Sequence, residues 1–248
     1  MTNNSPLLLH IPHASTVIPP EEIPRFCPLD LGDEQLKMTD RYCDELFSGY
    51  DSVIFPVSRL VCDPERFRDD AEETMSRIGM GTVYTRTSSG GILRTVTEEE
   101  REKLLRRYYD PHHARLTEAV EEKLRLHSRC LIVDGHSFHP VPLPYEPDQE
   151  PGRPDFCIGT DPYHTPGLLA DYAMGFLQSE GFSVFLNRPY GGSLVPMKYY
   201  GRDRRICSIM IEINRRLYMD GNGQRSNRFS SIQRTVSILL EKLEDWKC

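Results

Sequence analysis

The stretch CLIVDGHS, residues 130–137, joins four apolar residues directly to an acidic residue, a glycine, a histidine and a serine. A short apolar run of this kind is typical of a buried strand. Functional groups of open α/β sheets collect where such strands end. Asp134 stands two residues before His136, so in an extended chain both side chains lie on the same face. Because a carboxylate beside an imidazole can orient or polarise it as a metal ligand, the stretch predicts a strand that leads into a functional site.

Two further apolar runs carry polar residues in places that suggest chemistry. The run LLLHIPH, residues 7–13, ends in His13, and the run IMIEIN, residues 209–214, has Glu212 in its middle. A carboxylate inside such a strand costs desolvation energy unless it is paired or faces a cavity. Glu212 is therefore either a structural residue paired with a cation such as Arg215, or a general base whose pKa is tuned by burial and a nearby metal ion.

The rest of the chain alternates apolar strand patterns with helix patterns. Thr97 and Glu100 form a capping box that opens a long helix, which Pro111 either kinks or divides into two segments. Strands alternating with helices are typical of a mainly parallel sheet. We therefore expect a single α/β domain over residues 1–248, with a mixed, mainly parallel sheet and helices on both faces. The predicted strands are 7–10, 52–57, 130–134, 156–159, 183–186 and 208–213, and the other predicted helices are 40–47, 166–180 and a last one around 232–243.

Composition narrows the functional classes. The 248 residues carry a net charge of −7 without a clustered basic footprint, which argues against a nucleic-acid partner. No apolar run approaches the length of a membrane span, and no basic segment followed by an apolar core opens the chain, so we expect neither a membrane partner nor a secretory leader. Seven cysteines without a C-x-x-C pair form neither a disulfide framework nor a zinc ribbon, which favours a reducing cytoplasm. They are Cys27, Cys43, Cys62, Cys130, Cys157, Cys207 and Cys248.

Histidines at strand ends point to a catalytic metal ion. Zinc hydrolases use three protein ligands and leave a position open for water, whose pKa the metal lowers to about 7. His13 and His136 stand at the ends of predicted strands, where such ligands are needed. His10 could replace His13, but it lies within the apolar run and is otherwise a core residue. The other histidines fall on predicted helices or loops and are expected at the surface; they include His112, His113, His127 and His164.

Arginines form a second cluster in SRLVCDPER, residues 58–66, directly after an apolar strand. Arg59 and Arg66 could clamp carboxylates in a bidentate manner. The structural alternative is that Arg59 pairs only with Asp63 or Glu65.

A glycine-containing turn, NRPYGGS at residues 187–193, follows another predicted strand. Its glycines permit close approach of the backbone to a ligand, and Tyr190 could donate a hydrogen bond, although a plain turn would explain the same residues. Two long irregular stretches, 77–95 and 140–154, are candidates for walls or a lid of the site, since loops of that length in compact domains usually serve a function.

Taken in order, these elements resemble the N-formylglutamate amidohydrolase (N-formylglutamate deformylase) family, a relative of the zinc carboxypeptidases and aspartoacylases. No element is very specific alone, whereas the ordered set runs through most of the chain. The resemblance implies a zinc-carboxypeptidase-like α/β fold with one catalytic zinc ion. The matching pieces are PHAS at 12–15, TD at 39–40, VSR at 57–59 with Asp63 and Arg66, DGHS at 134–137, NRPYGG at 187–192 and IEIN at 211–214.

The resemblance also implies roles for particular side chains. By position, His13 is the first zinc ligand and His136 the later one. Asp134 lies behind His136, and Glu212 matches the general base.

Two positions depart from the pattern of the family and its relatives. Carboxypeptidase relatives have a glutamate ligand three residues after the first histidine, where this chain has Thr16. Asp40 of the TD motif is taken as the replacement ligand, with Glu21 and Glu22 as alternatives. The residue before the second arginine is usually asparagine in the family and is Glu65 here, and its negative charge weakens the case for a doubly anionic substrate.

Together the residues predict a zinc-dependent amidohydrolase that cleaves the amide of a small N-acyl amino acid. N-formyl-L-glutamate, which would give L-glutamate and formate, is the first choice. Arg59 and Arg66 would hold a substrate carboxylate, or one of them would stabilise the oxyanion. Asn187 and Tyr190 would contact the substrate. The alternatives are a metallocarboxypeptidase or amidase on another acyl or peptidyl substrate, and a non-catalytic protein that binds a metal ion or an anion.

Overall fold

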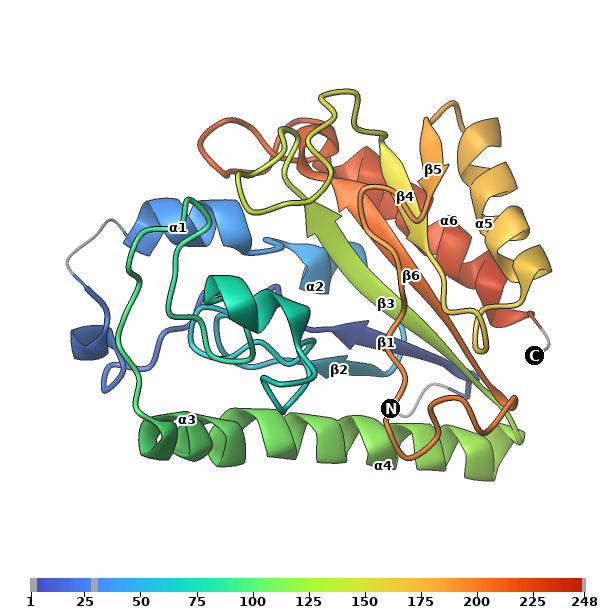
Figure 1. Cartoon of the computed structure of the whole chain (residues 1–248). Coiled ribbons are helices and arrows are strands. Elements are labelled where there is room, and N and C mark those ends of the chain that lie inside the picture. The colour runs from blue at the N-terminus through green and yellow to red at the C-terminus, as the bar shows by residue number, and fades with distance from the viewer. Residues whose placement is uncertain (1–3, 28–30, 247–248) are drawn as a thin grey trace.

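A computed structural model describes residues 4–27 and 31–246 of the chain, so that Cys248 lies outside the described part. Within these residues six strands form one sheet in the order β2-β1-β3-β6-β4-β5 (Figure 1). Strand β4 runs antiparallel to β6, whereas the other neighbouring pairs are parallel. The mixed, mainly parallel sheet predicted from the alternating pattern is thereby confirmed. The strands are β1 (Leu7–Ile11), β2 (Ser52–Ile54), β3 (Cys130–Phe138), β4 (Phe156–Gly159), β5 (Val184–Leu186) and β6 (Ile206–Asn214).

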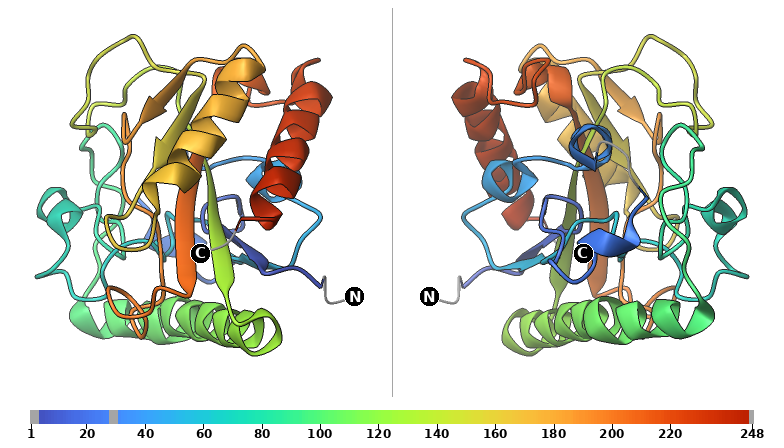
Figure 2. Two further views of the ribbon diagram at one scale, coloured as in Figure 1. Left: turned by 90° about the vertical axis from the view of Figure 1, so that its right-hand side faces the viewer. Right: turned by 90° about the vertical axis from the view of Figure 1, so that its left-hand side faces the viewer.

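Helices lie on both faces of the sheet (Figures 1 and 2). The long helix α4 contacts β1, β2 and β3 on one face. Helix α5 contacts β4 and β5, and helix α2 contacts β3. Helix α6 packs against both α2 and α5. None of the described helices combines the length and the apolar content that a membrane span requires. The helices are α1 (Leu31–Met38), α2 (Cys43–Leu46), α3 (Glu98–Leu104), α4 (Asp110–His127), α5 (Gly167–Ser179) and α6 (Phe229–Glu244).

The alternation of side chains along the strands divides the core into two layers. The isoleucines of β6 at 209, 211 and 213 pack with the helices α2, α5 and α6. Ile132 of β3 packs on the opposite face with Leu116 and Val120 of α4. Each such side chain contributes about 1.5–3 kcal/mol when fully buried, so the sheet is held from both sides and its strand ends are fixed in space.

Several local predictions are confirmed and others need correction. The capping box of Thr97 and Glu100 is formed. A π-helical segment, Leu105–Tyr109, joins α3 to α4, and Pro111 lies in the first turn of α4. The helix predicted over 40–47 is only Cys43–Leu46, because the preceding Tyr42 adopts a left-handed backbone with φ 67°.

The strand predicted to end at residue 134 continues to Phe138, so His136 lies within β3 rather than beyond its end. The reason is the neighbouring strand β6, which pairs with β3 residue by residue along all nine positions. Gly135 makes this extension possible. A Cβ atom there would come within 2.8 Å of the side chains of Ile11 and Phe47, so only glycine lets the strand pass this close to α2.

Candidate active site

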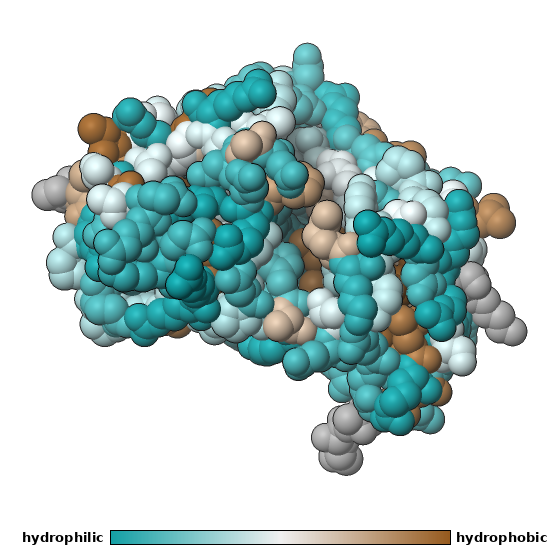
Figure 3. Space-filling model, turned by 60° about the horizontal axis from the view of Figure 1, so that its bottom comes forward, coloured by the Kyte–Doolittle hydropathy of each residue, from teal (hydrophilic) through white to brown (hydrophobic). Residues whose placement is uncertain are grey.

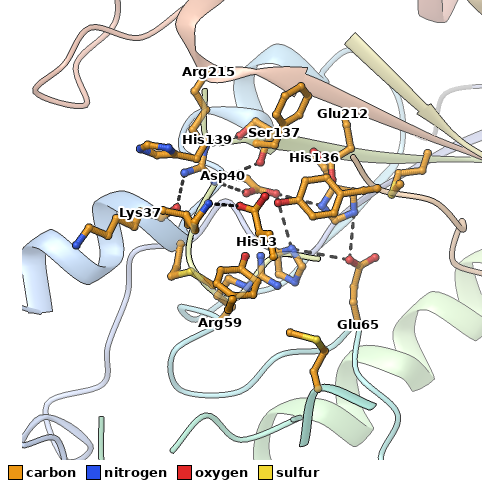
Figure 4. Close-up of a pocket in the computed structure, with 18 of the residues that line it drawn as sticks. His13, Lys37, Asp40, Arg59, Glu65, His136, Ser137, His139, Glu212 and Arg215 are labelled. Atoms are coloured by element: carbon orange, nitrogen blue, oxygen red, sulfur yellow. Dashed lines mark hydrogen bonds and ion pairs between the residues drawn. The ribbon is translucent and has the colours of Figure 1, made fainter. Parts of the chain in front are cut away.

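The candidate active site lies on the α4 face of the sheet, towards the carboxyl ends of β1, β3 and β6. In the sheet register His10 stands beside Asp134, and His136 stands beside Glu212. Since side chains two residues apart share a face, the pleat of β3 and β6 presents these polar groups together. His13, two residues beyond the end of β1, joins them, and Figure 4 shows its ring turned towards the same space as His136 and Glu65.

The two predicted histidine ligands face each other, with ring centroids 5.1 Å apart. Each ring is held from behind by a carboxylate. His13 Nε2 lies 2.9 Å from Asp63 Oδ1, and His136 Nδ1 lies 3.1 Å from Asp40 Oδ2. A carboxylate partner of this kind fixes the tautomer and orientation of a metal-binding histidine. The opposite nitrogens, His13 Nδ1 and His136 Nε2, are buried and have no hydrogen-bond partner.

Glu65 reaches both of these nitrogens. Its Oε2 atom lies 3.2 Å from His136 Nε2 and 3.8 Å from His13 Nδ1. His13, Glu65 and His136 thus offer three ligand atoms within 4.8 Å of one another. Two imidazoles and a carboxylate are a donor set that suits zinc. Burial opposes protonation of His136, yet the charges of Glu65 and Asp134 outweigh it and raise the pKa of His136 well above its ordinary value. The space between these residues therefore attracts positive charge.

Asp40, the predicted second ligand, belongs to neither group of ligand atoms found in the described residues. Its Oδ2 atom accepts the hydrogen bond from His136, and its Oδ1 atom lies 2.8 Å from Arg215 Nη2. Its backbone amide also donates to the carbonyl of His13. The structure places Asp40 behind His136 and beside His13, whose Nδ1 atom lies 3.7 Å from Asp40 Oδ2. Asp134, which the resemblance placed behind His136, has its Oδ1 atom 3.2 Å from His136 Nε2.

A second group of ligand atoms, His10, Glu65 and Asp134, shares Glu65 with the first. In this group both ring nitrogens of His10 already have hydrogen-bond partners. His10 Nδ1 lies 2.7 Å from Asp134 Oδ1, and His10 Nε2 lies 2.8 Å from His112 Nε2. Because no nitrogen of His10 is left over, the first group is the better fit for a metal ion.

His112 is buried, which corrects the expectation that it lies at the surface. Burial lowers its pKa to about 2, so the ring is neutral. The sequence did contain a signal: His112, Leu116 and Val120 follow one another at intervals of four and belong to the buried stripe of α4. His164 is likewise buried, with its ring bonded to the Ile206 carbonyl.

Glu212 is buried in the same cavity as the histidine pair. Its Oε2 atom has no hydrogen-bond partner. Burial is the main cause that raises its pKa to about 8. The structural alternative for Glu212 was an ion pair with a neighbouring arginine, but Arg215 pairs with Asp40 and Arg216 pairs with Asp155. A buried carboxylate turned into a cavity is the arrangement expected of a general base.

The cavity in front of these groups has a volume of about 220 Å³ and a basic side. Arg59 lines it, but its Nη2 atom also lies 2.8 Å from Asp63 Oδ2, so the predicted clamp and the predicted ion pair coexist. Loop 140–154 forms part of the wall, as expected, through Tyr145 and neighbouring residues. The cationic side chains around the cavity are Lys37, Arg59, Arg66 and Arg215; Figure 4 labels all of them except Arg66.

The turn after β5 is only partly in this cavity. Tyr190 and Gly191 line it. Asn187 does not: its side chain is exposed, and its Oδ1 atom accepts a hydrogen bond from the amide of Thr160 at 2.8 Å. The structure therefore brings Tyr190 to the histidine pair and leaves Asn187 in the turn that carries it.

The family model for N-formylglutamate amidohydrolase matches residues 5–219 of this chain. The chain belongs to this family. A curated N-formylglutamate deformylase of Pseudomonas aeruginosa is 25% identical over 258 aligned positions, which cover 96% of this chain and 91% of that protein. The relation of the family to zinc carboxypeptidases and aspartoacylases stays a prediction.

Two solved structures share the fold of this family member. The N-formylglutamate amidohydrolase from Ralstonia eutropha JMP134 is 25% identical with a TM-score of 0.81, covering 97% of this chain and 93% of that one. A gene product of Agrobacterium tumefaciens is 21% identical with a TM-score of 0.69, covering 98% of this chain and 95% of that one. The second of these shows similarity of fold alone.

Two residues of this N-formylglutamate amidohydrolase family member were not assigned to the metal site from the sequence. Asp63 was considered as a partner of Arg59 and as a piece of the family pattern, and Glu65 as an alternative partner of Arg59 and as a departure from that pattern. Both lie in an irregular segment after β2, where no periodicity shows which way a side chain points. The signal available was their spacing. Residues 63 and 65 are two positions apart, with Pro64 between them, so their side chains can point to the same side of an extended chain.

Proposed function

We propose that this chain is a metal-dependent amidohydrolase that cleaves the amide of a small N-acyl amino acid, with N-formyl-L-glutamate as the first substrate. The single observation that carries the proposal is the pair of buried nitrogens of His13 and His136 that have no hydrogen-bond partner and face a shared carboxylate, Glu65, in the cavity that Glu212 also lines. Family membership and the names of the two relatives that are N-formylglutamate hydrolases support the substrate.

His13 Nδ1, His136 Nε2 and Glu65 would hold a zinc ion. When bound, zinc would polarise the acyl carbonyl and lower the pKa of a water molecule. We assign Glu65 rather than Asp40 as the third ligand, because Asp40 is engaged by both His136 and Arg215. Asp40 and Asp63 would orient the two imidazole rings, and Asp134 would hold His10 and add negative charge next to His136.

Glu212 would act as the general base. Its free Oε2 atom would accept a proton from the attacking water and pass it to the nitrogen of the leaving amine. The oxygen of that water would bond to the acyl carbon as the carbon–nitrogen bond breaks, so that N-formyl-L-glutamate and water give formate and L-glutamate. A nearby cation lowers the pKa of a carboxyl group, which would keep Glu212 ionised despite its burial.

The basic side of the cavity would bind the carboxylates of the amino acid. Arg66 is the strongest candidate, because its Nε atom is buried without a hydrogen-bond partner and lies 3.8 Å from Asp63 Oδ2. Arg59 is held by Asp63 and would present its remaining donors to the substrate. Tyr190 would close the pocket next to Phe138, with the two ring centroids 6.2 Å apart.

A cytoplasmic location is part of the proposal. Cys27, Cys43, Cys62 and Cys157 are free thiols, three of them buried, which agrees with a reducing compartment.

The experiment combines elemental analysis of the purified protein with an assay of formate release from N-formyl-L-glutamate. We expect about one zinc ion per chain, loss of formate release after chelation, and recovery on adding zinc. Protein that releases formate equally well without any metal would refute metal dependence, and metal-loaded protein that never releases formate would refute the substrate.

Substitution of the proposed base provides the second arm. Glu212→Gln should keep its zinc and lose formate release by about 10²–10⁴-fold, the usual contribution of a general base. A matched control is Glu34→Gln, which changes another buried glutamate that bonds to Ser88 away from the cavity. Normal turnover in Glu212→Gln would remove the base assignment.

A further inference from the structure

A second cavity adjoins the first on the far side of Glu65. Its volume is about 370 Å³. The two cavities share a boundary that consists of Glu65, Arg66, Gly191 and Met210. Glu65 also belongs to both groups of ligand atoms. The cavities therefore adjoin at Glu65, and a molecule bound across this boundary can extend one arm into each. The face shown in Figure 3 is hollowed near its middle, with hydrophobic colour inside the hollow.

The lining of the second cavity differs in charge from that of the first. Lys37, Arg59 and Arg215 line the first cavity only, and Arg66 is the cation common to both. The carboxylates of Glu65 and Asp134 line the second cavity, whereas the first is lined by those of Asp40, Glu65, Glu146 and Glu212. His113 also lines it. Burial lowers the pKa of His113 to about 4, so this ring adds no positive charge at neutral pH.

The remaining wall of the second cavity is mainly apolar, with Ser193 and Tyr200 among its polar residues. Most of it comes from the segment after Gly192 and from the segment after Arg66, with one side chain from the π-helical turn before α4. The apolar side chains are Phe67, Tyr109, Leu194, Val195, Met197 and Met210.

This wall is anchored to the candidate active site. The amide of Leu194 donates a hydrogen bond to Asp134 Oδ2 at 3.2 Å. Ser208 of β6 donates from its hydroxyl to the Leu194 carbonyl at 2.9 Å. Val195 is buried against the α4 layer of the core. The apolar surface is thus held at a fixed place beside the residues that would bind the metal.

We propose that the second cavity binds the acyl arm of the substrate, and that this arm can be a neutral, apolar acyl group larger than formyl. This inference rests on the proposed function. The amino-acid carboxylates would lie in the basic first cavity and the amide would lie across the boundary at Glu65. A formyl group has two heavy atoms and leaves nearly all of the second cavity to water, whereas an alkyl chain would bury its methylenes against Leu194 and Met197. An anionic acyl group is disfavoured, because the carboxylate of Asp134, which lines the second cavity, would repel it.

The test is a substrate series on the zinc-loaded protein: N-formyl-, N-acetyl-, N-butyryl-, N-hexanoyl- and N-succinyl-L-glutamate, with release of glutamate as the readout. We expect kcat/KM to rise by up to about fourfold for each methylene buried, and N-succinyl-L-glutamate to react more slowly than N-butyryl-L-glutamate. Hydrolysis of the formyl compound with a steep fall for every longer acyl group would overturn the inference and leave the proposed function intact. Failure to hydrolyse any member of the series would overturn the proposed function, and the inference with it.

A pair of variants locates the acyl arm. Leu194→Ala removes an apolar wall of the second cavity, so the ratio of the hexanoyl to the formyl kcat/KM should fall several-fold. Met197→Ala, at the exposed rim of the cavity, should lower the same ratio without threatening folding. Leu126→Ala changes an exposed leucine at the far end of α4 and serves as the control. An unchanged ratio in both cavity variants would show that the chain binds elsewhere and would refute the placement.

Discussion

The most informative single substitution is Asp63→Asn, because Asp63 is the point at which the histidine pair and the arginine side of the cavity are joined. The carboxylate is fully buried. Its Oδ1 atom bonds to His13 Nε2 at 2.9 Å and accepts from the amide of Glu65 at 3.0 Å. Its Oδ2 atom accepts from Arg59 Nη2 at 2.8 Å and from the hydroxyl of Tyr84 at 2.6 Å. Burial opposes its charge, but Arg59 and His13 outweigh burial and hold the pKa of Asp63 well below its ordinary value.

The expected cost follows from these contacts. Asparagine has one acceptor oxygen and no charge, so either the histidine side or the arginine side loses its partner. Removing one member of a buried ion pair costs about 3–5 kcal/mol. For a chain of 248 residues this corresponds to a fall in Tm of roughly 6–20 °C, at about 2–4 °C per kcal/mol. The orientation of His13 is also lost, so zinc affinity should fall by about 10–100-fold.

The assay measures thermal unfolding of the metal-free protein and zinc affinity by competition with a chelator. Unfolding of the metal-free protein measures the contribution of the Asp63 ion pair to stability. Chelator competition measures how far Asp63 supports zinc binding by orienting His13. Glu121→Gln is the control, because its pair with Lys198 is exposed and such pairs contribute about 0–1 kcal/mol. A metal-free Asp63→Asn protein that melts within one or two degrees of the parent and binds zinc equally well would refute this account of Asp63.

Three shorter predictions test other parts of the structure. Glu65→Gln should abolish stoichiometric zinc binding, whereas Asp40→Asn should weaken zinc affinity by only about 10–100-fold; elemental analysis and chelator competition measure both, and the reverse order would make Asp40 the ligand. His113 has its pKa lowered from 6.5 to about 4 by burial, so the unfolded chain binds more protons between these values and stability falls as the pH drops through that window. The fall in Tm between pH 6.5 and 4 should therefore be smaller in His113→Gln, and an identical pH profile would contradict this. Thr97→Ala should cost about 0.5–2 kcal/mol by removing the helix cap, measured by urea unfolding, and a stability equal to that of the parent would contradict the cap's role.

The parts of the fold that the sequence predicts well are those with strong hydrophobic patterns. Each of the six strands in the described residues overlaps a predicted one, because a short run of apolar residues is typical of a buried strand. The same logic brings His136 and Glu212 together, since neighbouring strands in a parallel sheet align their carboxyl ends. Helix α1 was missed because only three of its eight residues are apolar, and of these only Met38 is buried.

The residues that the sequence did not place are those whose position depends on tertiary contacts rather than on pattern. Asp40 follows α1 on a short connection, and sequence alone does not show that Arg215, which is 175 positions away, occupies its Oδ1 atom. Glu65 lies in a loop whose course depends on hydrogen bonds from Arg94 to the carbonyls of Leu60 and Val61. An arginine buried for this purpose has no sequence signature, because its partners are backbone atoms.

The position of Glu65 also changes the meaning of its charge. In the sequence, a glutamate beside Arg66 argues against a doubly anionic substrate, because both would compete for the same cations. In the structure its Oε2 atom lies 3.2 Å from His136 Nε2, so the negative charge is directed towards the proposed metal position. A divalent cation held by two neutral imidazoles and this carboxylate leaves a net charge of about +1 at the site. The charge of Glu65 is then balanced locally, and Arg59 and Arg66 remain available to substrate carboxylates. The glutamate that weakened the case for N-formyl-L-glutamate in the sequence is therefore compatible with that substrate once the metal is bound.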